Sequence, residues 1–430
     1  MKGKIKNFFI LLLQRLWITF ELFNRNGMMN HASACAYGFL LSAAPALLFI
    51  TFVVSRFLSA SPELAEAMME QMAPLFGVFE AGNIDMGFLN SANFGVAGLV
   101  SVITILWITR FCAISVQRGL GVVFPGPRSV IRNNAVVLGL GLFAMFVILI
   151  TLLGLRLAVN FYNSSGLSFL RISAPVFILS TRIILLLALA LMALAAYRFF
   201  PANPPKVKNI IPGVLACIVF FWIFTSAFSL LINPDSYNII YGTLGRLFLF
   251  LVNVYFFFVF FFFGAQLIQA LGISDALLFA RFRQVHSKRK PPKSILDRAF
   301  AVLPGPLKKY TAFFKNGDSV FAMHSQGKEV YYILSGKAAV YMDIECNHKV
   351  AVIDEANFFG EEASLTPDDK SGRVASIKAE TDLSVLILPP ALFNVILQID
   401  PNTDKNIIRN LAENLKYVNQ KINPATPEKM

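Results

Sequence analysis

The segment from Tyr241 to Leu271 reads YGTLGRLFLFLVNVYFFFVFFFFGAQLIQAL, and its longer part decides the fold. From Leu247 to Leu271 it contains no Asp, Glu, Lys or Arg. At ~1.5 Å per residue, a helix of about 25 residues crosses the ~30 Å hydrocarbon core of a bilayer. A helix that is apolar on nearly every side is typical of a membrane span. The segment therefore predicts a transmembrane helix.

The composition of the whole chain agrees with this prediction. Of the 430 residues, 56% are hydrophobic and only 15% are charged, whereas soluble domains average about 25% charged residues. The formal net charge is +13, but Lys and Arg mostly flank apolar segments on one side, as the positive-inside rule requires. We therefore expect an integral membrane protein in contact with the lipid bilayer, and no binding of nucleic acid.

Five further apolar segments precede the predicted transmembrane helix at 247–271. They lie near residues 32–58, 94–115, 135–159, 172–199 and 210–232. The loop 61–93 carries acidic residues and no Lys or Arg. Basic residues gather in the alternate loops and after the last span: Arg118, Arg128, Arg132, Lys206, Lys208, Arg281 and Arg283. Because basic loops stay in the cytoplasm, the sequence predicts a multi-pass protein of the inner membrane with six transmembrane helices and both termini cytoplasmic.

The C-terminal part of the chain has a different pattern. Short segments such as VYYILSG and LSVLILP alternate or run apolar between Gly, Asp and Asn, which predicts short strands. Apolar residues then recur at helical spacing over 404–421. We expect a small antiparallel β-barrel or jelly-roll domain with terminal helices.

These patterns divide the chain into five parts. The predicted parts are an interfacial amphipathic helix at 1–30, a six-helix α-helical membrane bundle at 31–280, a basic Pro-containing linker at 281–309, the β-domain at 310–422 and a tail at 423–430.

The motif FFGEEASLTPDDKSGRVAS, at residues 358–376, is the sharpest in the β-domain. It resembles the phosphate-binding cassette of the cyclic nucleotide-binding domain family. The resemblance implies that backbone N–H groups after Gly360 and the guanidinium of Arg373 hold a cyclic phosphate, and that Glu361 accepts from the ribose 2′-hydroxyl. It assigns this ligand site, for cAMP or cGMP, to Gly360, Glu361, Ala363, Arg373, Val374, Ala375 and Ser376.

The cassette departs from the family pattern at several positions. Glu362 and Ser364 stand where the family often has apolar residues, and Gly372 follows Ser371 where a proline is common. Val374 replaces a small residue beside the phosphate. Pairing of Arg373 with Glu361 at a turn, without a ligand, is therefore the alternative.

Four blocks in the membrane part resemble the YihY/BrkB family of bacterial inner-membrane proteins. They are ACAYGFLLSAAP, YRFFP, YGTLG and FGAQL, which begin at Ala34, Tyr197, Tyr241 and Phe263. The family often has a glutamate where Gln266 stands. The resemblance suggests a transporter or a lipid- or envelope-handling protein.

Polar groups in a membrane span are costly and often mark a pathway, and prolines there bend the helix. The candidates for a membrane pathway are Arg182, Asn253, Gln266, Tyr37 and Pro45.

Some members of that family have been labelled ribonucleases. Ribonuclease activity requires a catalytic centre. The histidines are isolated, with no HxHxDH or HExxH spacing, and no P-loop or nucleophile elbow is present. We therefore expect no catalytic residues, no metal site, no cofactor and no enzymatic activity.

Two functional hypotheses follow. In the first, cyclic nucleotide in a cytoplasmic sensor domain regulates the membrane bundle. In the second, the protein is a non-enzymatic envelope protein whose β-domain is an unliganded structural or partner-binding module. A homo-oligomer is compatible with both.

Overall fold

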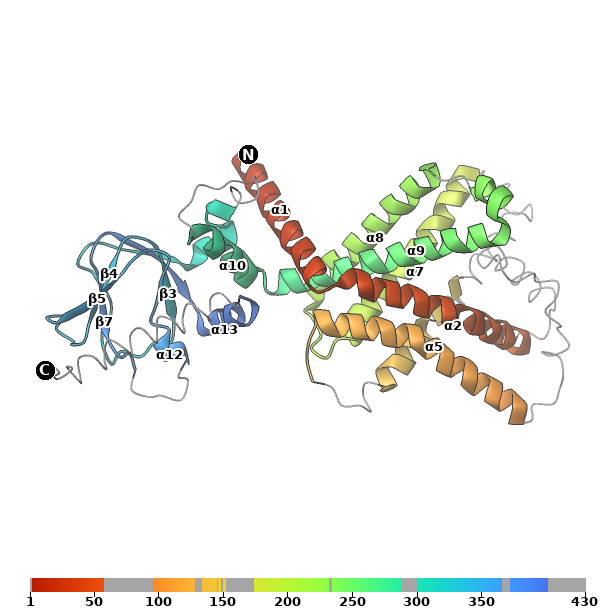
Figure 1. Cartoon of the computed structure of the whole chain (residues 1–430), viewed down its shortest axis with the longest axis horizontal. Coiled ribbons are helices and arrows are strands. Elements are labelled where there is room, and N and C mark those ends of the chain that lie inside the picture. The colour runs from red at the N-terminus through yellow and green to blue at the C-terminus, as the bar shows by residue number, and fades with distance from the viewer. Residues whose placement is uncertain are drawn as a thin grey trace, which may run out of the picture. The chain divides into compact units, whose positions relative to one another are not determined.

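The computed structural model describes residues 2–57, 96–127, 134–144, 146–147, 150–151, 174–231, 234–287, 298, 300–365 and 372–400. The chain divides into two compact units. The helical unit is Thr19–Gly272, and the mixed unit combines Met1–Ile18 with Ile273–Met430 (Figure 1).

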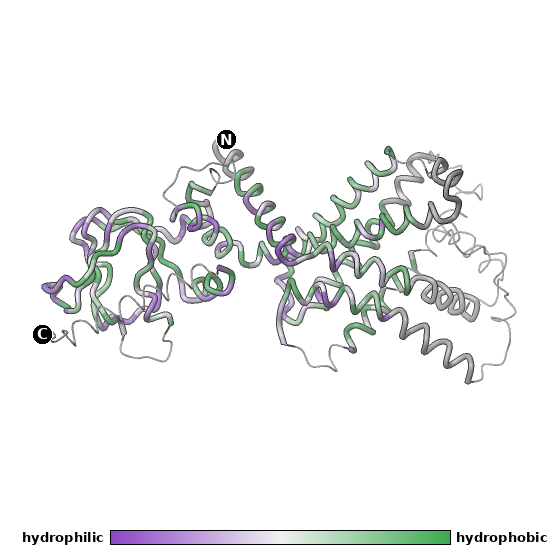
Figure 2. Tube along the Cα trace, in the orientation of Figure 1, coloured by the Kyte–Doolittle hydropathy of each residue, from purple (hydrophilic) through white to green (hydrophobic). Residues whose placement is uncertain are grey.

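The helical unit is built from long apolar helices. They are the end of α1 (Lys2–Arg25), α2 (Met28–Phe57), α5 (Val96–Val123), the helix Asn134–Ala144, α7 (Ala174–Phe199), α8 (Val207–Leu231) and α9 (Pro234–Gly272). Among the described residues, Val207–Leu231 and Phe248–Gly272 are long and apolar enough to cross a membrane. Figure 2 shows the hydrophobic character of these helices along the trace. The predicted helical region with strongly apolar helices is confirmed.

Some helix ends differ from the prediction. Helix α9 begins at Pro234, so that most of the short loop expected before Leu247 is helical. Proline is favourable at the first helical position, because its fixed φ suits the helix and its missing N–H is not needed there. Helix α5 continues to Val123, well past the expected end near 115.

Helices α8 and α9 lie in direct contact. The ring of Phe224 stacks on that of Phe256 at 4.2 Å, and Phe220 meets Phe263 edge-on at 5.4 Å. Their backbones also touch, since a Cβ added at Gly264 would lie 2.5 Å from the carbonyl oxygen of Gly213. Small residues at such a crossing allow the close packing that holds helices together in lipid.

Helix α7 joins this pair through Tyr197. The Tyr197 hydroxyl donates a 2.6 Å hydrogen bond to the carbonyl of Phe261, and the two rings stack at 4.7 Å. The Tyr197 side chain is fully buried. The Tyr197 hydroxyl also lies against Gly264. Tyr197 belongs to the block YRFFP and Gly264 to the block FGAQL, so these two family-like blocks meet in the core of the helical unit.

The mixed unit contains the β-domain. Its helical elements are α10 (Ser274–His286), the 3₁₀ helix η3 (Gly305–Tyr310), α12 (Glu362–Leu365) and α13 (Pro390–Ile399). Its strands are β1 (Thr311–Phe314), β2 (Ser319–Phe321), β3 (Val330–Ser335), β4 (Ala338–Tyr341), β5 (Lys349–Ile353), β6 (Phe358–Phe359), β7 (Ser376–Ala379) and β8 (Leu383–Leu388).

The strands form two four-stranded antiparallel sheets. One has the order β1-β8-β3-β6 and the other β2-β7-β4-β5. Buried residues of both sheets share one core, in which Ile333 and Val385 of the first sheet pack with Ala338 and Ile377 of the second. The predicted antiparallel C-terminal domain is confirmed.

The predicted linker 281–309 is partly helical. Helix α10 extends to His286 and buries Leu278, Phe279 and Phe282, and η3 occupies the end of the range. The basic residues between these apolar positions concealed the helix in the sequence. The acidic loop 61–93, the linker residues 288–297 and 299, the terminal helix expected at 404–421 and the tail lie outside the residues that the structure describes.

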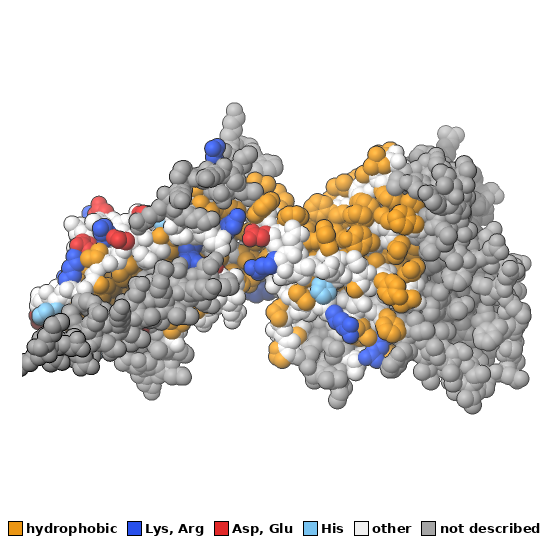
Figure 3. All heavy atoms as spheres, in the orientation of Figure 1, with side chains coloured by type: hydrophobic (Ala, Val, Ile, Leu, Met, Phe, Trp, Pro, Cys, Tyr) orange, Lys and Arg blue, Asp and Glu red, His pale blue; other side chains and the backbone are white. Residues whose placement is uncertain are grey.

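Surface character also differs between the two units. In the face shown by Figure 3, hydrophobic side chains dominate the described part of the helical unit, whereas acidic and basic side chains are spread over the β-domain. This contrast fits a helical unit that is surrounded by lipid and a β-domain that is surrounded by water.

The close approach of α8 and α9 gives a first test. Gly264→Ala places a methyl group 2.5 Å from the Gly213 carbonyl oxygen and 2.7 Å from the Tyr197 hydroxyl. Overpacking of this kind costs ~1–3 kcal/mol. We expect the apparent melting temperature of the full chain in detergent to fall by several degrees.

The matched control is Gly121→Ala in α5, where an added Cβ meets nothing within 4 Å. This variant should leave the melting temperature unchanged or slightly higher, because alanine is the better helix former. Equal melting temperatures for the two variants would contradict the packing described here.

Candidate functional site

The backbone of Arg373 is fixed beside the loop that follows β2. Its N–H donates to the carbonyl of Ser325 at 3.1 Å, and its carbonyl accepts from the N–H of His324 at 2.8 Å. Gly372, directly before it, has a φ of +77°, and a Cβ there would lie 2.8 Å from the His324 carbonyl oxygen. Glycine is therefore required at this position.

The guanidinium of Arg373 joins two separate segments of the β-domain. Nη1 donates to the carbonyl of Gly360 and Nη2 to the carbonyl of Glu329, both at 2.8 Å. The Glu329 carboxylate lies 3.5 Å from Nη2. The Arg373 side chain is only 3% exposed. Two of its five N–H groups are thus used to hold backbone carbonyls in place.

Two aromatic rings complete the surroundings of this charge. The guanidinium carbon lies 4.3 Å from the ring centre of Phe321 and 5.6 Å from that of Tyr331. Cation–π contacts of this kind offset part of the cost of removing a cation from water. Burial lowers the pKa of Arg373, which the nearby Tyr331, Glu329 and Glu362 oppose.

Gly360 has a conformation that this contact requires. Its φ is +74°, and a Cβ there would lie 2.6 Å from Nη1 of Arg373. Any other residue would combine backbone strain with a clash against the guanidinium. The glycine and the arginine of the cassette motif are therefore in direct contact.

Glu361 is a buried carboxyl group. Its side chain is 3% exposed, and Oε2 has no hydrogen-bond partner among the described residues. Burial and the neighbouring Glu362 raise its pKa to about 7, against an ordinary value of 4.5. A buried carboxyl with one unpartnered oxygen and a raised pKa is a frequent feature of ligand sites.

The other predicted site residues have more modest surroundings. The Ser376 hydroxyl accepts from the N–H of Met323 at 2.9 Å and donates to the carbonyl of Asp343 at 2.8 Å. Ala375 is buried, Val374 is 51% exposed, and Ala363 is half-buried in α12. The hydroxyl of Ser376 therefore holds neighbouring loops together.

The membrane-pathway candidates whose side chains are described have different surroundings. Tyr37 is exposed, and Asn253 donates to the carbonyl of Leu249 one turn earlier in its own helix. Gln266 is fully buried, and neither amide atom has a partner among the residues described. Arg182 lies in α7 and Pro45 in α2, but the structure does not describe their side chains.

Sequence reasoning missed several residues around Arg373. Glu329 contributes a carbonyl, and Phe321 and Tyr331 contribute rings. The alternating pattern of β3 places Tyr331 in a strand, but nothing in the sequence pairs it with a residue of the cassette. A backbone carbonyl has no signature in the sequence at all.

A second buried charge was also missed. Arg283 of α10 forms a 2.8 Å ion pair with Asp400, the residue after α13, and both side chains are buried. The Arg283 guanidinium lies 5.9 Å from the ring centre of Phe358, beside the cassette. Helices α10 and α13 are therefore joined by charge as well as by packing.

Comparison with known families identifies both parts of the chain. Residues 19–281 match the family model "Virulence factor BrkB", which is more than half of the sequence. The chain belongs to the Virulence factor BrkB family. Residues 311–400 of this BrkB-family protein match the model "Cyclic nucleotide-binding domain". Both resemblances inferred from the sequence motifs are confirmed, and the protein is a membrane protein with a cyclic nucleotide-binding domain.

Solved structures similar to the BrkB-family chain match about a quarter to a third of its length. The catabolite activator protein of Thermus thermophilus has 22% identity and a TM-score of 0.24, over 26% of this chain and 53% of that one. The cAMP-bound PfPKA-R has 18% identity and a TM-score of 0.25, over 34% of this chain and 48% of that one. The cAMP-bound EAL enzyme Bd1971 has 20% identity and a TM-score of 0.21, over 25% of this chain and 29% of that one. Each of these three matches spans less than two thirds of the other chain. No curated protein matches the sequence.

The buried Glu361 predicts a dependence of stability on pH. Its pKa in the folded protein lies above the unfolded value, so the folded state binds more protons between pH 4.5 and about 7. Stability therefore falls as pH rises through that window, by about 1.4 kcal/mol per unit of pKa shift. Hydrogen–deuterium exchange of β3 and β6 in the full chain measures this free energy.

In Glu361→Gln the opening free energy of these strands should vary much less with pH over the same range. The control is Glu345→Gln, at an exposed position, which should behave as the wild type does. A wild-type protein whose strands open equally at pH 5 and pH 7.5 would exclude this role for Glu361.

Proposed function

We propose that this BrkB-family protein is a membrane protein whose bundle is regulated by a cyclic nucleotide bound at the cassette. The observation that carries the proposal is the contact of Arg373 with Gly360, beside Glu361, whose Oε2 has no hydrogen-bond partner among the described residues. The guanidinium would bind a cyclic phosphate, and the carboxylate would accept a hydrogen bond from a ribose hydroxyl.

Binding requires a local rearrangement, because the Arg373 side chain is 3% exposed. A phosphate is a stronger acceptor for a guanidinium than a carbonyl is, since the resulting hydrogen bonds join two ions. Arg373 would therefore exchange its carbonyl partners at Gly360 and Glu329 for the ligand. Release of these two segments would change the cassette on occupancy.

The route from the cassette to the membrane runs through α10. Helix α9 ends at Gly272 and α10 begins at Ser274, so one residue separates them in the chain. The Arg283–Asp400 pair ties α10 to the end of α13, and Phe279 of α10 meets Phe358 at a ring distance of 6.0 Å. A conformational change at Phe358 and Gly360 would thus alter the contacts of α10.

The finer features of the membrane half belong to the same proposal. We infer six spans in the inner membrane, cytoplasmic termini, a jelly-roll arrangement of the two sheets, and a role in transport or in handling lipid or envelope components, without enzymatic activity. The alternation of acidic and basic loops in the sequence supports this topology.

One observation favours a second candidate function. The carbonyls of Gly360 and Glu329 already satisfy two donors of Arg373, as expected of a purely structural arginine. In that case the β-domain is an unliganded module that binds a partner or stabilises the protein. Binding measurements separate the two.

Calorimetry on the full chain in detergent tests the ligand directly. We expect heat of binding with cAMP or cGMP, and an affinity lower by a factor of about 10 to 100 in Arg373→Ala, because a hydrogen bond to a charged group is worth ~1.5–3 kcal/mol. Lys337→Ala, which removes an exposed ion pair with Asp354, should bind as the wild type does.

Because Arg373 also holds two carbonyls, Glu361→Gln serves as a second variant that keeps them. It should weaken binding while leaving the cassette folded. Absence of heat with any cyclic nucleotide in the folded wild type would favour the unliganded module.

The coupling route has its own test. We expect nucleotide to change hydrogen–deuterium exchange in α10 of the wild type, and Asp400→Asn to abolish that change while binding persists. Loss of one partner of a buried pair also lowers stability by ~3–5 kcal/mol. The control is Lys309→Ala, which removes the partly exposed pair with Asp275 and should preserve the response. An unchanged α10 response in Asp400→Asn would exclude this route.

A further inference from the structure

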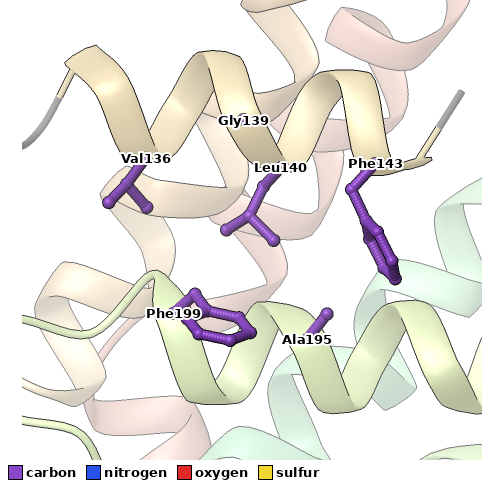
Figure 4. A pocket seen from close by; sticks show the side chains of 6 residues that line it. All are labelled: Val136, Gly139, Leu140, Phe143, Ala195 and Phe199. Carbon is purple, nitrogen blue, oxygen red and sulfur yellow. The ribbon is translucent and has the colours of Figure 1, made fainter.

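The helical unit contains an apolar cavity between the helix Asn134–Ala144 and α7. Its volume is about 300 Å³. The lining residues are all apolar or glycine: Val136, Gly139, Leu140, Phe143, Ala195 and Phe199. Figure 4 shows the side chains of the two helices facing each other across this space. The volume is at the lower end of ligand pockets and offers no polar side chain to a ligand.

The two helices that line the cavity also carry exposed apolar side chains. Phe199, on its wall, is 58% exposed. Large hydrophobic side chains on the same two helices are exposed as well: Leu138, Leu142, Leu187, Leu191 and Leu194. In a membrane protein, hydrocarbon rather than water covers such a surface. A lipid chain is therefore the occupant that fits this lining.

The cavity lies where the predicted spans meet the cytoplasm. The helix Asn134–Ala144 begins after the basic loop, and α7 ends at Phe199 before Lys206. Arg198 is exposed and adjoins Phe199 in the last turn of α7. A basic residue at this depth attracts the phosphate of an anionic lipid in the inner leaflet.

The neighbouring loops are held together at this end of the helical unit. The side-chain amide of Asn203, after α7, donates to the carbonyl of Pro125, after α5, at 3.3 Å. Arg110 of α5 donates to the side-chain oxygen of Asn134 at 3.0 Å, which fixes the start of the second helix. The end of α7 is therefore tied to the end of α5, and the start of the helix Asn134–Ala144 is tied to the interior of α5.

We propose that this cavity holds one acyl chain of an anionic phospholipid from the inner leaflet, with its headgroup phosphate at Arg198. The inference deepens the membrane half of the proposed function, on which it rests, by naming the lipid class. It does not involve the cyclic nucleotide.

Two glycines of the same helix allow a matched test. A Cβ added at Gly139 or at Gly141 meets nothing within 4 Å, so either position accepts a larger residue. Gly139 lines the cavity and Gly141 does not. Two residues along a helix are rotated by about 200°, so they face nearly opposite sides. Gly139→Phe therefore fills the cavity, and Gly141→Phe adds the same ring elsewhere.

The experiment uses the full chain in nanodiscs of phosphatidylethanolamine and phosphatidylglycerol. A trace of phosphatidylglycerol carries a photoactivatable diazirine in one acyl chain, and mass spectrometry locates the adducts. In the wild type we expect adducts concentrated on 134–144 and 183–199. Gly139→Phe should reduce them several-fold, and Gly141→Phe should leave them unchanged. Matching size-exclusion profiles and melting temperatures would establish that both variants are folded.

The headgroup is tested with Arg198→Gln and with photoactivatable phosphatidylcholine and free fatty acid. We expect the variant to reduce labelling by phosphatidylglycerol several-fold but labelling by phosphatidylcholine little. Equal wild-type labelling by all three probes would overturn the assignment of an anionic lipid.

Other results would overturn the site itself. Equal labelling of the two phenylalanine variants would do so. Even labelling of all apolar helices would indicate ordinary surrounding lipid. Absence of adducts would indicate that a second copy of the chain covers the cavity. The same labelling in Arg373→Ala as in the wild type is expected, so failure here is distinguishable from failure of nucleotide binding.

Discussion

A buried cation, the guanidinium of Arg373, holds the cassette of the β-domain in its observed form. Removing a guanidinium from water costs several kcal/mol, and the domain offsets this with two carbonyls and two rings. The carbonyls belong to Glu329 and Gly360, which are far apart in the chain. Loss of Arg373 would leave both carbonyls without these bonds, so the arginine shapes the cassette whether or not a ligand is present.

The helical unit depends on a different constraint. Within a bilayer, the hydrophobic effect does not favour contact between apolar helices, so association relies on close packing and on hydrogen bonds. Gly213 and Gly264 provide the close packing, and Tyr197 provides a hydrogen bond to the α9 backbone. The close packing and the hydrogen bond both involve residues of the family-like blocks. These blocks therefore have a structural role in holding the helices together.

How far the sequence predicted the structure differs between features. The absence of charge from Leu247 to Leu271 predicted an apolar helix, because length and polarity are local properties. The cassette motif predicted that Gly360 and Arg373 lie together, since a fixed spacing across one loop carries that information. Arg283 and Asp400 could not be paired in advance, because they are remote in the chain and an isolated charge does not specify its partner. The end of helix α10, from Arg281 to His286, was assigned to the linker, because its basic residues resemble those of a loop beside the membrane.

The raised pKa of Glu361 has a consequence for signalling. A ribose hydroxyl donates a stronger hydrogen bond to a carboxylate than to a neutral carboxyl group, and burial raises the pKa of this carboxyl to about 7. If nucleotide binds at this carboxylate, occupancy depends on two quantities together, the nucleotide concentration and the pH around the β-domain. Acidification would then lower the occupancy at an unchanged nucleotide concentration.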